Sequence, residues 1–211
     1  YAIKQWNREK FMNDKWGRNY LGTPPQSKAD YAFIQHIIAS MDNKTGRCAI
    51  LLPHGILFRK EEKDMREKLV QMDTLEAVIA LGHNLFYNSA MISCVLVCRV
   101  NKDDKHKNKV IFIDAEQDVT RKNAQSFLAD HQIEKILNAY NNFEDVDGFA
   151  KVVTNEEIKK SGSVLSISYY VEGIEEENID IDESIQTWKD CSVIFNKEVS
   201  SLIDLINNGN V

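Results

Sequence analysis

The chain has 211 residues, of which 43% are hydrophobic and 27% are charged, an ordinary composition for a globular protein. This length would usually form one domain, or one domain with an appendage, and it is long enough to bury a real core. No apolar run approaches the roughly 20 residues that span a bilayer, which excludes a membrane-spanning helix, and we expect a cytoplasmic protein. Because the chain begins at Tyr1 and not at a methionine, the lack of a signal peptide is uninformative.

The formal net charge of -6 is unevenly distributed. Residues 172–183 (EGIEEENIDIDE) contain seven acidic residues and no basic one, which accounts for the whole excess. The first 28 residues have the opposite bias, with only Glu9 and Asp14 against Lys4, Arg8, Lys10, Lys15, Arg18 and Lys28. Because nucleic acids bind to local basic patches, the net charge does not exclude such a partner.

The first twenty residues (YAIKQWNREKFMNDKWGRNY) contain five aromatic side chains spaced among charges. Neither a stable surface helix nor a core strand has this pattern. Aromatic rings can stack on unpaired bases while lysines and arginines neutralise phosphates, so the segment suits a nucleic-acid partner. Residues 22–25 (GTPP) predict a rigid turn after it.

Residues 27–42 have apolar side chains at helical spacing, which predicts a helix with Ser27 as N-cap and a glycine turn after it. Its expected buried face consists of Tyr31, Ile34, Ile37, Ile38 and Met41. Residues 47–53 (RCAILLP) form a continuous apolar run, which is typical of a strand buried on both faces. A charged helix is predicted at 60–72, with a buried side made of Met65, Leu69 and Met72.

Two further apolar runs, residues 75–81 (LEAVIAL) and 90–100 (AMISCVLVCRV), predict strands joined only by the link 82–89 (GHNLFYNS). Since so short a link cannot hold a crossover helix, we expect this pair to be antiparallel. Alternating helices and apolar strands indicate an α/β fold with a mostly parallel sheet that ends in an antiparallel strand. Beyond it we predict a strand at 110–115, helical segments at about 120–142 and a short strand at 149–153.

Common catalytic and metal-binding patterns are not found: the sequence has no GxGxxG after a strand, no P-loop, no HExxH and no nucleophile elbow. The cysteines include no CxxC pair, and we predict reduced, buried thiols at Cys48, Cys94, Cys98 and Cys191. We expect His36 to be structural, and His106 and His131 to lie on the surface. His54 and His83 each follow a predicted buried strand directly.

Ligands in open α/β sheets bind beyond the carboxyl ends of the strands, which directs attention to residues 53–58 (PHGILF) and 82–89. The second loop carries Leu85, Phe86 and Tyr87 in succession, where apolar burial is not the default. These side chains either fold back onto the sheet edge or form a stacking surface for a planar ligand. The sequence leaves both alternatives open.

Residues 172–183 predict a solvated acidic linker, and residues 184–211 contain a predicted helix that ends at Gly209. Two columns repeat every seven residues along it, formed by Trp188, Phe195 and Leu202 and by Ser192, Val199 and Ile206. Such a seam packs either on its own domain or on a helix of another molecule. We favour the second alternative because an exposed acidic linker precedes the helix.

Together these segments resemble a known family. Residues 22–59 and 65–102 are similar to the methylation (M) subunits of type I restriction–modification systems, which are adenine-N6 DNA methyltransferases that use S-adenosylmethionine. The resemblance depends on ADYAF, LPHGILFR and NLFY in this order and continues to about residue 171. It implies an S-adenosylmethionine-dependent methyltransferase fold, Rossmann-like, in which residues 1–171 form the second half of the sheet with an antiparallel last strand. The linker and a C-terminal helix for subunit interaction follow.

The family's catalytic motif is Asn-Pro-Pro-Tyr or Asn-Pro-Pro-Phe, and the segment after it resembles YAIKQWNREKF. By this resemblance Tyr1 would be the aromatic fourth residue of the motif and would act in catalysis. Tyr1 and Phe86 or Tyr87 would stack on a flipped adenine, with Pro53 at the same sheet edge. The cofactor's adenine would be bordered by Asp30, Tyr31 and Phe33, while His54 receives no role.

The resemblance also implies that Asn-Pro-Pro, the glycine-rich cofactor loop and an N-terminal helical domain precede this chain, which alone would then be inactive. The implied partners are double-stranded DNA, a specificity (S) subunit, a second M subunit and a restriction (R) subunit. An alternative is a non-catalytic DNA- or protein-binding scaffold module with a methyltransferase-like sheet. Half of a nucleotide-dependent dehydrogenase also fits the sheet, but the sequence offers no phosphate-binding loop for it.

Overall fold

The computed structural model describes residues 5–86, 91–123 and 125–171, together with a C-terminal set: residues 186, 188–193, 195–197, 199 and 200. The chain divides into two compact units, Tyr1–Gly173 and Ile174–Val211, and each is described by itself. The predicted acidic linker, residues 172–183, lies outside the described residues.

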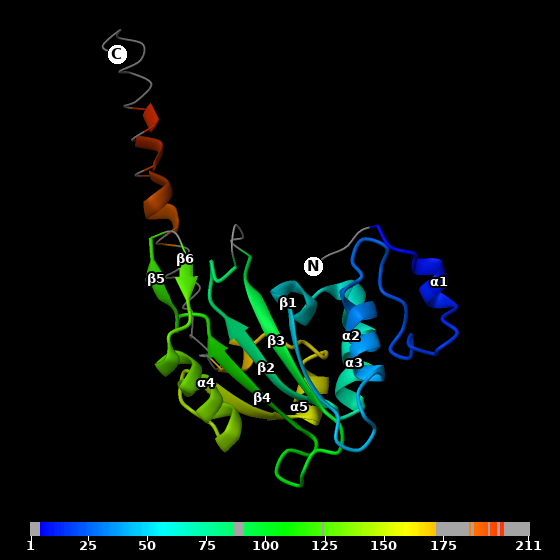
Figure 1. The fold of residues 1–211 in the computed structure, drawn as a ribbon. Helices are drawn as coiled ribbons and strands as arrows, with labels where there is room; N and C mark the ends of the chain where they lie inside the picture. The colour runs from blue at the N-terminus through cyan, green and yellow to red at the C-terminus, as the bar shows by residue number, and fades with distance from the viewer. Residues whose placement is uncertain are drawn as a thin grey trace. The chain divides into compact units, whose positions relative to one another are not determined.

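A five-stranded sheet with the order β1-β3-β2-β4-β7 forms the centre of the first unit (Figure 1). β3 is antiparallel to both β1 and β2, β2 is parallel to β4, and β7 is antiparallel to β4. The α/β class and the antiparallel pairing of β2 with β3 are therefore confirmed. The strands are β1 (Arg47–Pro53), β2 (Leu75–Leu81), β3 (Ser93–Arg99), β4 (Lys109–Ala115) and β7 (Ala150–Thr154).

The prediction of a mostly parallel sheet that ends in an antiparallel strand is wrong for the described strands, because β3 lies inside the sheet and only the β2–β4 pairing is parallel. The chain crosses from β1 to β2 through α3 (Lys63–Gln71) and leaves room for one strand between them. The short link after β2 then turns β3 back into this position. As a consequence β1 and β2, although not neighbours, run in the same direction.

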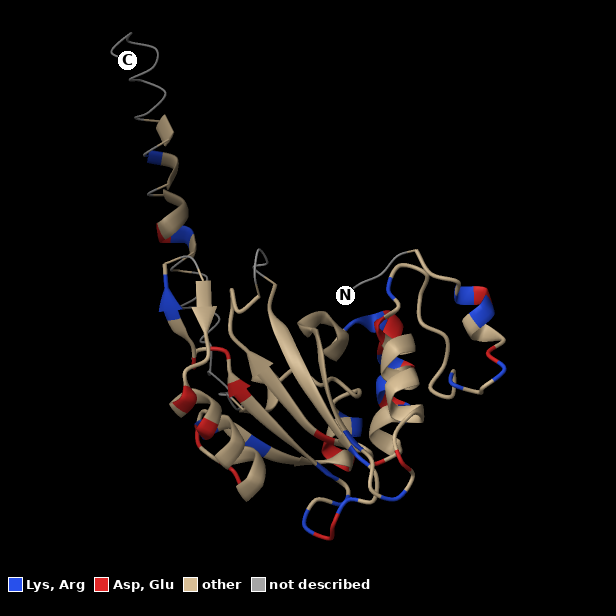
Figure 2. Ribbon diagram, in the orientation of Figure 1, with Lys and Arg blue, Asp and Glu red and all other residues tan. Residues whose placement is uncertain are grey.

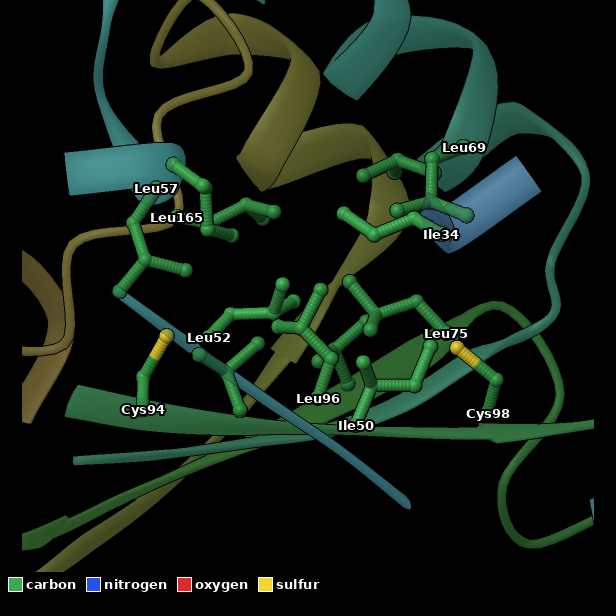
Figure 3. Close-up of a cluster of buried hydrophobic side chains, with 14 of the residues drawn as sticks. Ile34, Ile50, Leu52, Leu57, Leu69, Leu75, Cys94, Leu96, Cys98 and Leu165 are labelled. Atoms are coloured by element: carbon green, nitrogen blue, oxygen red, sulfur yellow. The ribbon is translucent and has the colours of Figure 1, made fainter. Parts of the chain in front are cut away.

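Four helices pack on one face of the sheet: α2 (Asp30–Ala39), α3, α5 (Asn155–Lys160) and α6 (Ser168–Val171). The predicted apolar face is confirmed: α2 contributes Tyr31, Ile34, Ile37 and Ile38 to the core, and Met41 packs there just after the helix ends. Figure 3 shows Ile34 of α2 and Leu69 of α3 above Ile50 of β1 and Leu96 of β3. Buried aliphatic contacts of this kind are the main source of stability for the fold.

The other face of the sheet is covered over β2 and β4 by the helix α4 (Asp130–Asn142). Ile136 of α4 and Phe143, which directly follows the helix, pack with Ile79, Ile111 and Ile113. On the same face, nearer to β1, the apolar residues are only partly buried: Leu51, Val95 and Val97. This face of the sheet is therefore covered over β2 and β4 and partly open over β1 and β3.

β1 is an edge strand, and the prediction that it is buried on both faces is wrong. Its residues alternate, with Ile50 and Leu52 buried and Arg47 and Ala49 exposed. No strand in the described ranges pairs with its outer edge. The apolar run arises because one face packs on α2 while the other is left partly open.

Two helix boundaries also differ from the prediction. α2 begins after Ala29, and Ser27 does not cap it, because residues 25–28 form a separate turn in which Lys28 N donates to Pro25 O. α3 ends at Gln71, so Met72 is exposed while Met65 and Leu69 are buried as predicted.

Residues 120–127 form an antiparallel hairpin, and the prediction that they are helical is wrong. The hairpin consists of β5 (Thr120–Lys122) and β6 (Gln125–Phe127), with Asn123 in the left-handed region at φ 59°. Asparagine tolerates this conformation, which reverses the chain. The strand prediction at 149–153 is confirmed by β7, and the remaining short elements are α1 (Arg8–Met12), η1 (His54–Leu57) and η2 (Lys60–Glu62).

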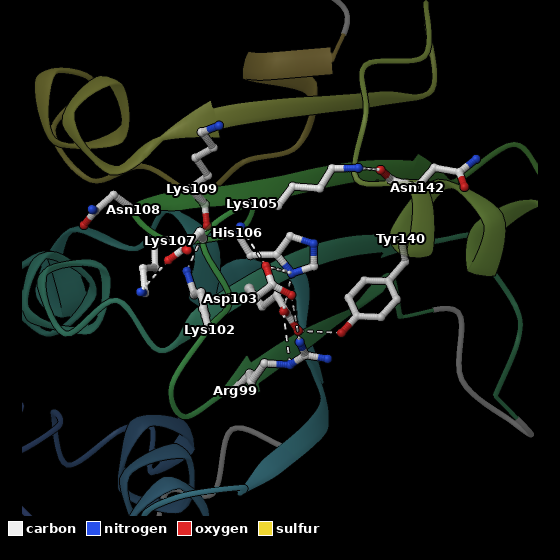
Figure 4. Close-up of polar contacts among 12 residues, drawn as sticks. Arg99, Lys102, Asp103, Lys105, His106, Lys107, Asn108, Lys109, Tyr140 and Asn142 are labelled. Carbon is white, nitrogen blue, oxygen red and sulfur yellow. Dashed lines mark hydrogen bonds and ion pairs between the residues drawn. The ribbon is translucent and has the colours of Figure 1, made fainter.

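His106 is partly buried, and the prediction that it lies on the surface is wrong. Its ring stacks on Phe143 with centroids 4.0 Å apart, and Nδ1 lies 2.8 Å from Glu76 Oε1. Glu76 is fully buried and also interacts with Arg99 and with the Tyr140 hydroxyl. Figure 4 shows the side chains of Arg99, His106 and Tyr140 converging at this end of the sheet. The network ties the β3–β4 loop and α4 to β2.

All four cysteines are free, as predicted, but they are not all buried. Cys94 and Cys98 are buried in β3, Cys48 is partly buried, and Cys191 is exposed. Cys48 lies directly opposite Cys98 in the β1–β3 pairing. His131 is exposed, as predicted.

The second unit is helical at its described residues between 186 and 200. Several of its apolar side chains are exposed, among them Trp188 (69%), Val193 and Phe195 (68%). Leu202 and Ile206 of the predicted seam lie outside the described residues. Across the described part of the chain, none of the helices has the length and apolar character required to cross a membrane.

Candidate functional site

The carboxyl ends of β1, β2 and β4 meet at one edge of the sheet. Ser93, the first residue of β3, pairs with Pro53 on one side and with Leu81 on the other, and Leu81 pairs with Ala115. The loops that follow Pro53, Leu81 and Ala115 therefore leave the sheet side by side, as Figure 1 shows. This arrangement confirms, for the described residues 53–58 and 82–86, the expectation that the two loops share an edge.

We call residues 82–86, which follow β2, the aromatic loop. Leu85 is partly buried and packs against the core under α4, whereas Phe86 is partly exposed. Leu85 thus folds back onto the sheet, and Phe86 remains partly accessible to a ligand. Tyr87 and Tyr1, the other two aromatic residues expected here, lie outside the described residues.

The β5–β6 hairpin packs directly against the aromatic loop. Ser126 N donates a hydrogen bond to Asn84 O at 2.9 Å. A Cβ on Gly82 would lie 2.4 Å from Val119 Cγ1 and 2.6 Å from Glu116 O, so only glycine fits at this contact. The sequence did not reveal this element, because its short strands precede a strongly helical segment.

Two buried polar atoms at the same edge have no hydrogen-bond partner among the described residues: His54 Nε2 and Ser93 Oγ. The His54 backbone N–H donates to Ile92 O at 3.2 Å, and its ring meets Phe58 edge to face. Pro53 is buried at the end of β1. Buried polar groups without partners are uncommon in proteins and are often found at functional sites.

A buried ion network connects the start of α2 to the segment that follows β1. Arg59 Nη1 lies 2.9 Å from Asp30 Oδ2 and 3.4 Å from Glu62 Oε2. The fully buried Arg66 donates through Nη1 to Arg59 O at 2.7 Å and through Nε to Ser163 O at 2.9 Å. Burial raises the pKa of Glu62 to about 7, although the Arg59 guanidinium opposes this shift.

The three residues expected at the cofactor differ in their accessibility. Asp30 is buried in its ion pair, and Tyr31 is buried in the core, where its hydroxyl donates to Ile56 O at 3.3 Å. Burial raises the pKa of Tyr31. Phe33 is 49% exposed. Of the three side chains, therefore, only Phe33 offers a substantial surface to a ligand.

Phe33 borders a pocket of about 290 Å³ between α2 and the N-terminal arm, which we define as residues 5–20. The arm is attached by two side-chain donors: Trp6 Nε1 bonds Gln26 O at 3.0 Å, and Arg8 Nε bonds Pro24 O at 2.8 Å. The pocket lining includes Trp6, Lys10, Phe11, Arg18, Phe33 and His36. The arm thus places aromatic rings and cations together, as its composition suggested.

The sequence indicated the two loops at the sheet edge and Phe33, but not the elements that support them. Glu62 belongs to the predicted charged helix at 60–72, whose expected buried side did not include it, and Arg59 directly precedes that helix. Only the burial of Glu62 and the long-range pair between Arg59 and Asp30 reveal their role in fixing α2.

Comparison with protein families gives a match to the N-6 DNA methylase model over residues 1–179. Among curated relatives, the chain is 37% identical over 194 residues to the type I restriction enzyme MjaVIII methylase subunit of Methanocaldococcus jannaschii. The alignment covers 86% of this chain and 33% of that relative. The chain is also 32% identical over 185 residues to the type I restriction enzyme HindI methylase subunit of Haemophilus influenzae, and this alignment covers 83% of the chain and 40% of the relative.

Among solved structures, the chain is similar to the methyltransferase subunit of a type I restriction-modification system from Streptococcus thermophilus. The TM-score is 0.74 at 35% identity, with 81% of this chain and 36% of that chain covered. The EcoKI M protein shares the fold, with a TM-score of 0.56 at 17% identity, covering 81% of this chain and 44% of that chain. The chain thus spans about a third of the length of the first curated relatives that it matches.

The buried Glu62 makes a testable contribution to pH-dependent stability. Its pKa of about 7 in the folded protein lies above the ordinary value of 4.5, so the folded state binds more protons between these values. The free energy of unfolding should therefore fall as pH rises from about 4.5 to 7. We expect Glu62→Gln to remove this contribution, measured as a flatter dependence of urea-denaturation stability on pH.

Glu61→Gln is the matched control, because Glu61 is exposed in the same turn. It should leave the wild-type pH dependence in place. Identical profiles for Glu62→Gln and the wild type would contradict the assigned protonation of Glu62.

Proposed function

Because the chain belongs to the N-6 DNA methylase family, we propose that it is the C-terminal part of the methylation subunit of a type I restriction–modification system. The complete subunit would transfer a methyl group from S-adenosylmethionine to the N6 atom of adenine in double-stranded DNA, in the cytoplasm. The observation that carries the proposal is the family match across residues 1–179 together with the aromatic loop at the shared strand edge. Relatives named as type I methylase subunits support it.

The partly exposed position of Phe86 fits the physical needs of this reaction. The adenine amino group is inaccessible inside a duplex, so enzymes that modify it turn the base out into a pocket and stack it between side chains. Phe86 follows β2, where the sheet edge gives access to a ligand. We propose that Phe86, with Tyr87 and Tyr1, forms this stacking surface. Pro53, at the same sheet edge, would contact the base from below.

S-adenosylmethionine supplies the methyl group when it is bound. Planar apolar rings suit a purine. The pocket between α2 and the N-terminal arm is lined by Phe33, Trp6 and Phe11, and its volume of about 290 Å³ is close to the lower limit of the range of about 300–1,000 Å³ for small-molecule sites. We propose that Phe33 contacts the adenine of the cofactor, while Asp30 and Tyr31 hold α2 in position through Arg59 and the Ile56 carbonyl.

The proposal that a longer subunit contains this chain has two supports. The chain covers about a third of its first curated relatives. In addition, β1 has an outer edge without a partner strand in the ranges that the structure describes, and the sheet face nearby is only partly covered. A preceding segment that supplies another strand and helix would satisfy both surfaces.

We further propose that the C-terminal helix docks on the specificity subunit, and that a second methylation subunit and a restriction subunit complete the complex. The exposed apolar residues Trp188, Val193 and Phe195 support an intermolecular contact. One related structure is described as part of the assembly of a type I system.

The reaction is tested by measuring transfer of labelled methyl groups from S-adenosylmethionine to duplex DNA. The 211-residue chain alone should give none, because the proposed catalytic turn and main cofactor loop precede it. The chain completed by its preceding segment, in complex with the specificity subunit, should methylate adenine. Methylation by the chain alone would refute the division of the active site, while DNA binding without methylation by the complete complex would support the non-catalytic scaffold.

The cofactor proposal predicts a separate effect of Phe33→Ala in the complete enzyme. Base–aromatic stacking contributes about 1–3 kcal/mol, so the KM for S-adenosylmethionine should rise about tenfold with a smaller change in kcat. Ile133→Ala on α4 is the control, since Ile133 is also exposed and apolar. An unchanged KM in Phe33→Ala would remove Phe33 from the cofactor site.

The C-terminal helix predicts a third outcome. Deleting residues 182–211 should weaken assembly with the specificity subunit about 30-fold, the effect of losing about 2 kcal/mol of interface contacts. Size-exclusion chromatography of the complex measures this loss, and circular dichroism of the deletion variant checks that the first unit stays folded. Complex formation at wild-type concentrations would show that the helix packs elsewhere.

A further inference from the structure

The β5–β6 hairpin carries positive charge to which the proposed function assigns no role. Arg121 and Lys122 are exposed on β5, and residues 119–129 contain no acidic side chain. Figure 2 shows this positive charge on β5. Within the described part of the chain neither cation forms an ion pair, and Arg121 Nε donates a hydrogen bond to Asn123 O at 3.4 Å.

The position of these cations beside the aromatic loop is fixed by the strand register. Arg121 lies opposite Ser126, and Ser126 N bonds Asn84 O, two residues before Phe86. The Cα atoms of Arg121 and Phe86 are therefore within roughly 18 Å of each other. One strand of B-DNA carries a phosphate about every 3.4 Å along its axis, so this upper limit corresponds to at most about five base pairs.

The hairpin is also held firmly at its base. Thr120 Oγ1 lies 3.2 Å from Gln132 Oε1, which also accepts from Ala129 N at 2.8 Å. Asp118, the acidic residue just before the hairpin, is paired with Lys135 of α4 at 2.8 Å. The tight contact of Gly82 with Val119 adds a second connection to the aromatic loop. The two cations therefore project from a supported element, and the nearest preceding carboxylate is neutralised.

We propose that the β5–β6 hairpin binds the sugar–phosphate backbone of the DNA beside the target adenine, through Arg121 and Lys122. This inference rests on the proposed function, because it takes the aromatic loop as the site of the flipped base. Turning a base out of the duplex displaces its own phosphates, and cations held at a fixed distance from the base pocket would retain the strand in that geometry. Charge complementarity commits the surface to a polyanion.

The test uses the methylation subunit completed by its preceding segment, in complex with the specificity subunit. The affinity for a duplex that contains the recognition site is measured by fluorescence anisotropy at several salt concentrations. Removing two phosphate contacts with Arg121→Ala/Lys122→Ala should lower the magnitude of the slope of log K against log salt by about 1.8, and should weaken binding about tenfold or more at 0.1 M salt. The methylation rate at saturating DNA should change much less.

Lys159→Ala/Lys160→Ala is the matched control, because it removes two exposed cations from α5, which follows β7 at the opposite edge of the sheet. It should leave the affinity and the salt slope unchanged. Equal effects of the two double variants would overturn the proposal, as would an unchanged slope in Arg121→Ala/Lys122→Ala, which would direct the hairpin to an acidic protein surface.

The failure of this inference is distinguishable from the failure of the proposed function. A complex that methylates DNA normally but shows no hairpin effect on binding overturns the inference alone. A complex that binds DNA without methylating it overturns the proposed reaction, and the salt slope of the hairpin variant still decides whether the hairpin contacts phosphates. A wild-type complex that does not bind DNA overturns both.

Discussion

The insertion of β3 between β1 and β2 is the constraint on which the rest of the candidate site depends. Ser93 pairs with Pro53 and with Leu81, so the ends of β1 and β2 are held two strand spacings apart, roughly 10 Å. Because β3 is antiparallel to both neighbours, the two flanking strands run in the same direction. Their loops must then emerge at one edge, with the side chain of His54 and the aromatic loop on either side of β3.

The two faces of α2 have different surroundings. Tyr31 and Ile34 anchor it in the core, while Phe33 is directed to the pocket beneath the N-terminal arm. The ion pair between Asp30 and Arg59 then links the first turn of this helix to the segment just after β1. The side chain of Arg59 is partly buried, and its backbone carbonyl accepts a hydrogen bond from Arg66 Nη1 at 2.7 Å, so both ends of this residue are fixed.

Much of this arrangement could be predicted from the sequence. Apolar periodicity located α2 and the buried side of α3, and continuous apolar runs located β2, β3 and β4. The short link after β2 required an antiparallel return. The position of β3 within the sheet could not be predicted in the same way, since strand order is set by contacts between distant segments. A local signal was nevertheless missed in Pro53, because proline lacks the N–H that an interior strand needs and therefore favours a sheet edge. The hairpin escaped prediction for another reason: its strands have three residues each, too few for a periodicity to emerge beside the longer pattern of α4.

Among the residues that the structure describes, no strand pairs with the outer edge of β1, which has a consequence for the behaviour of the chain in solution. An unpaired strand edge offers backbone donors and acceptors to any other extended segment, and copies of the same chain are the nearest candidates at high concentration. Here the edge is limited at both ends, by the charge of Arg47 and by the missing N–H of Pro53. Only residues 48–52 remain as a template for strand addition. Self-association of the isolated chain would accordingly depend on its concentration. A strand that pairs with this edge would occupy the free backbone groups and so prevent aggregation through β1.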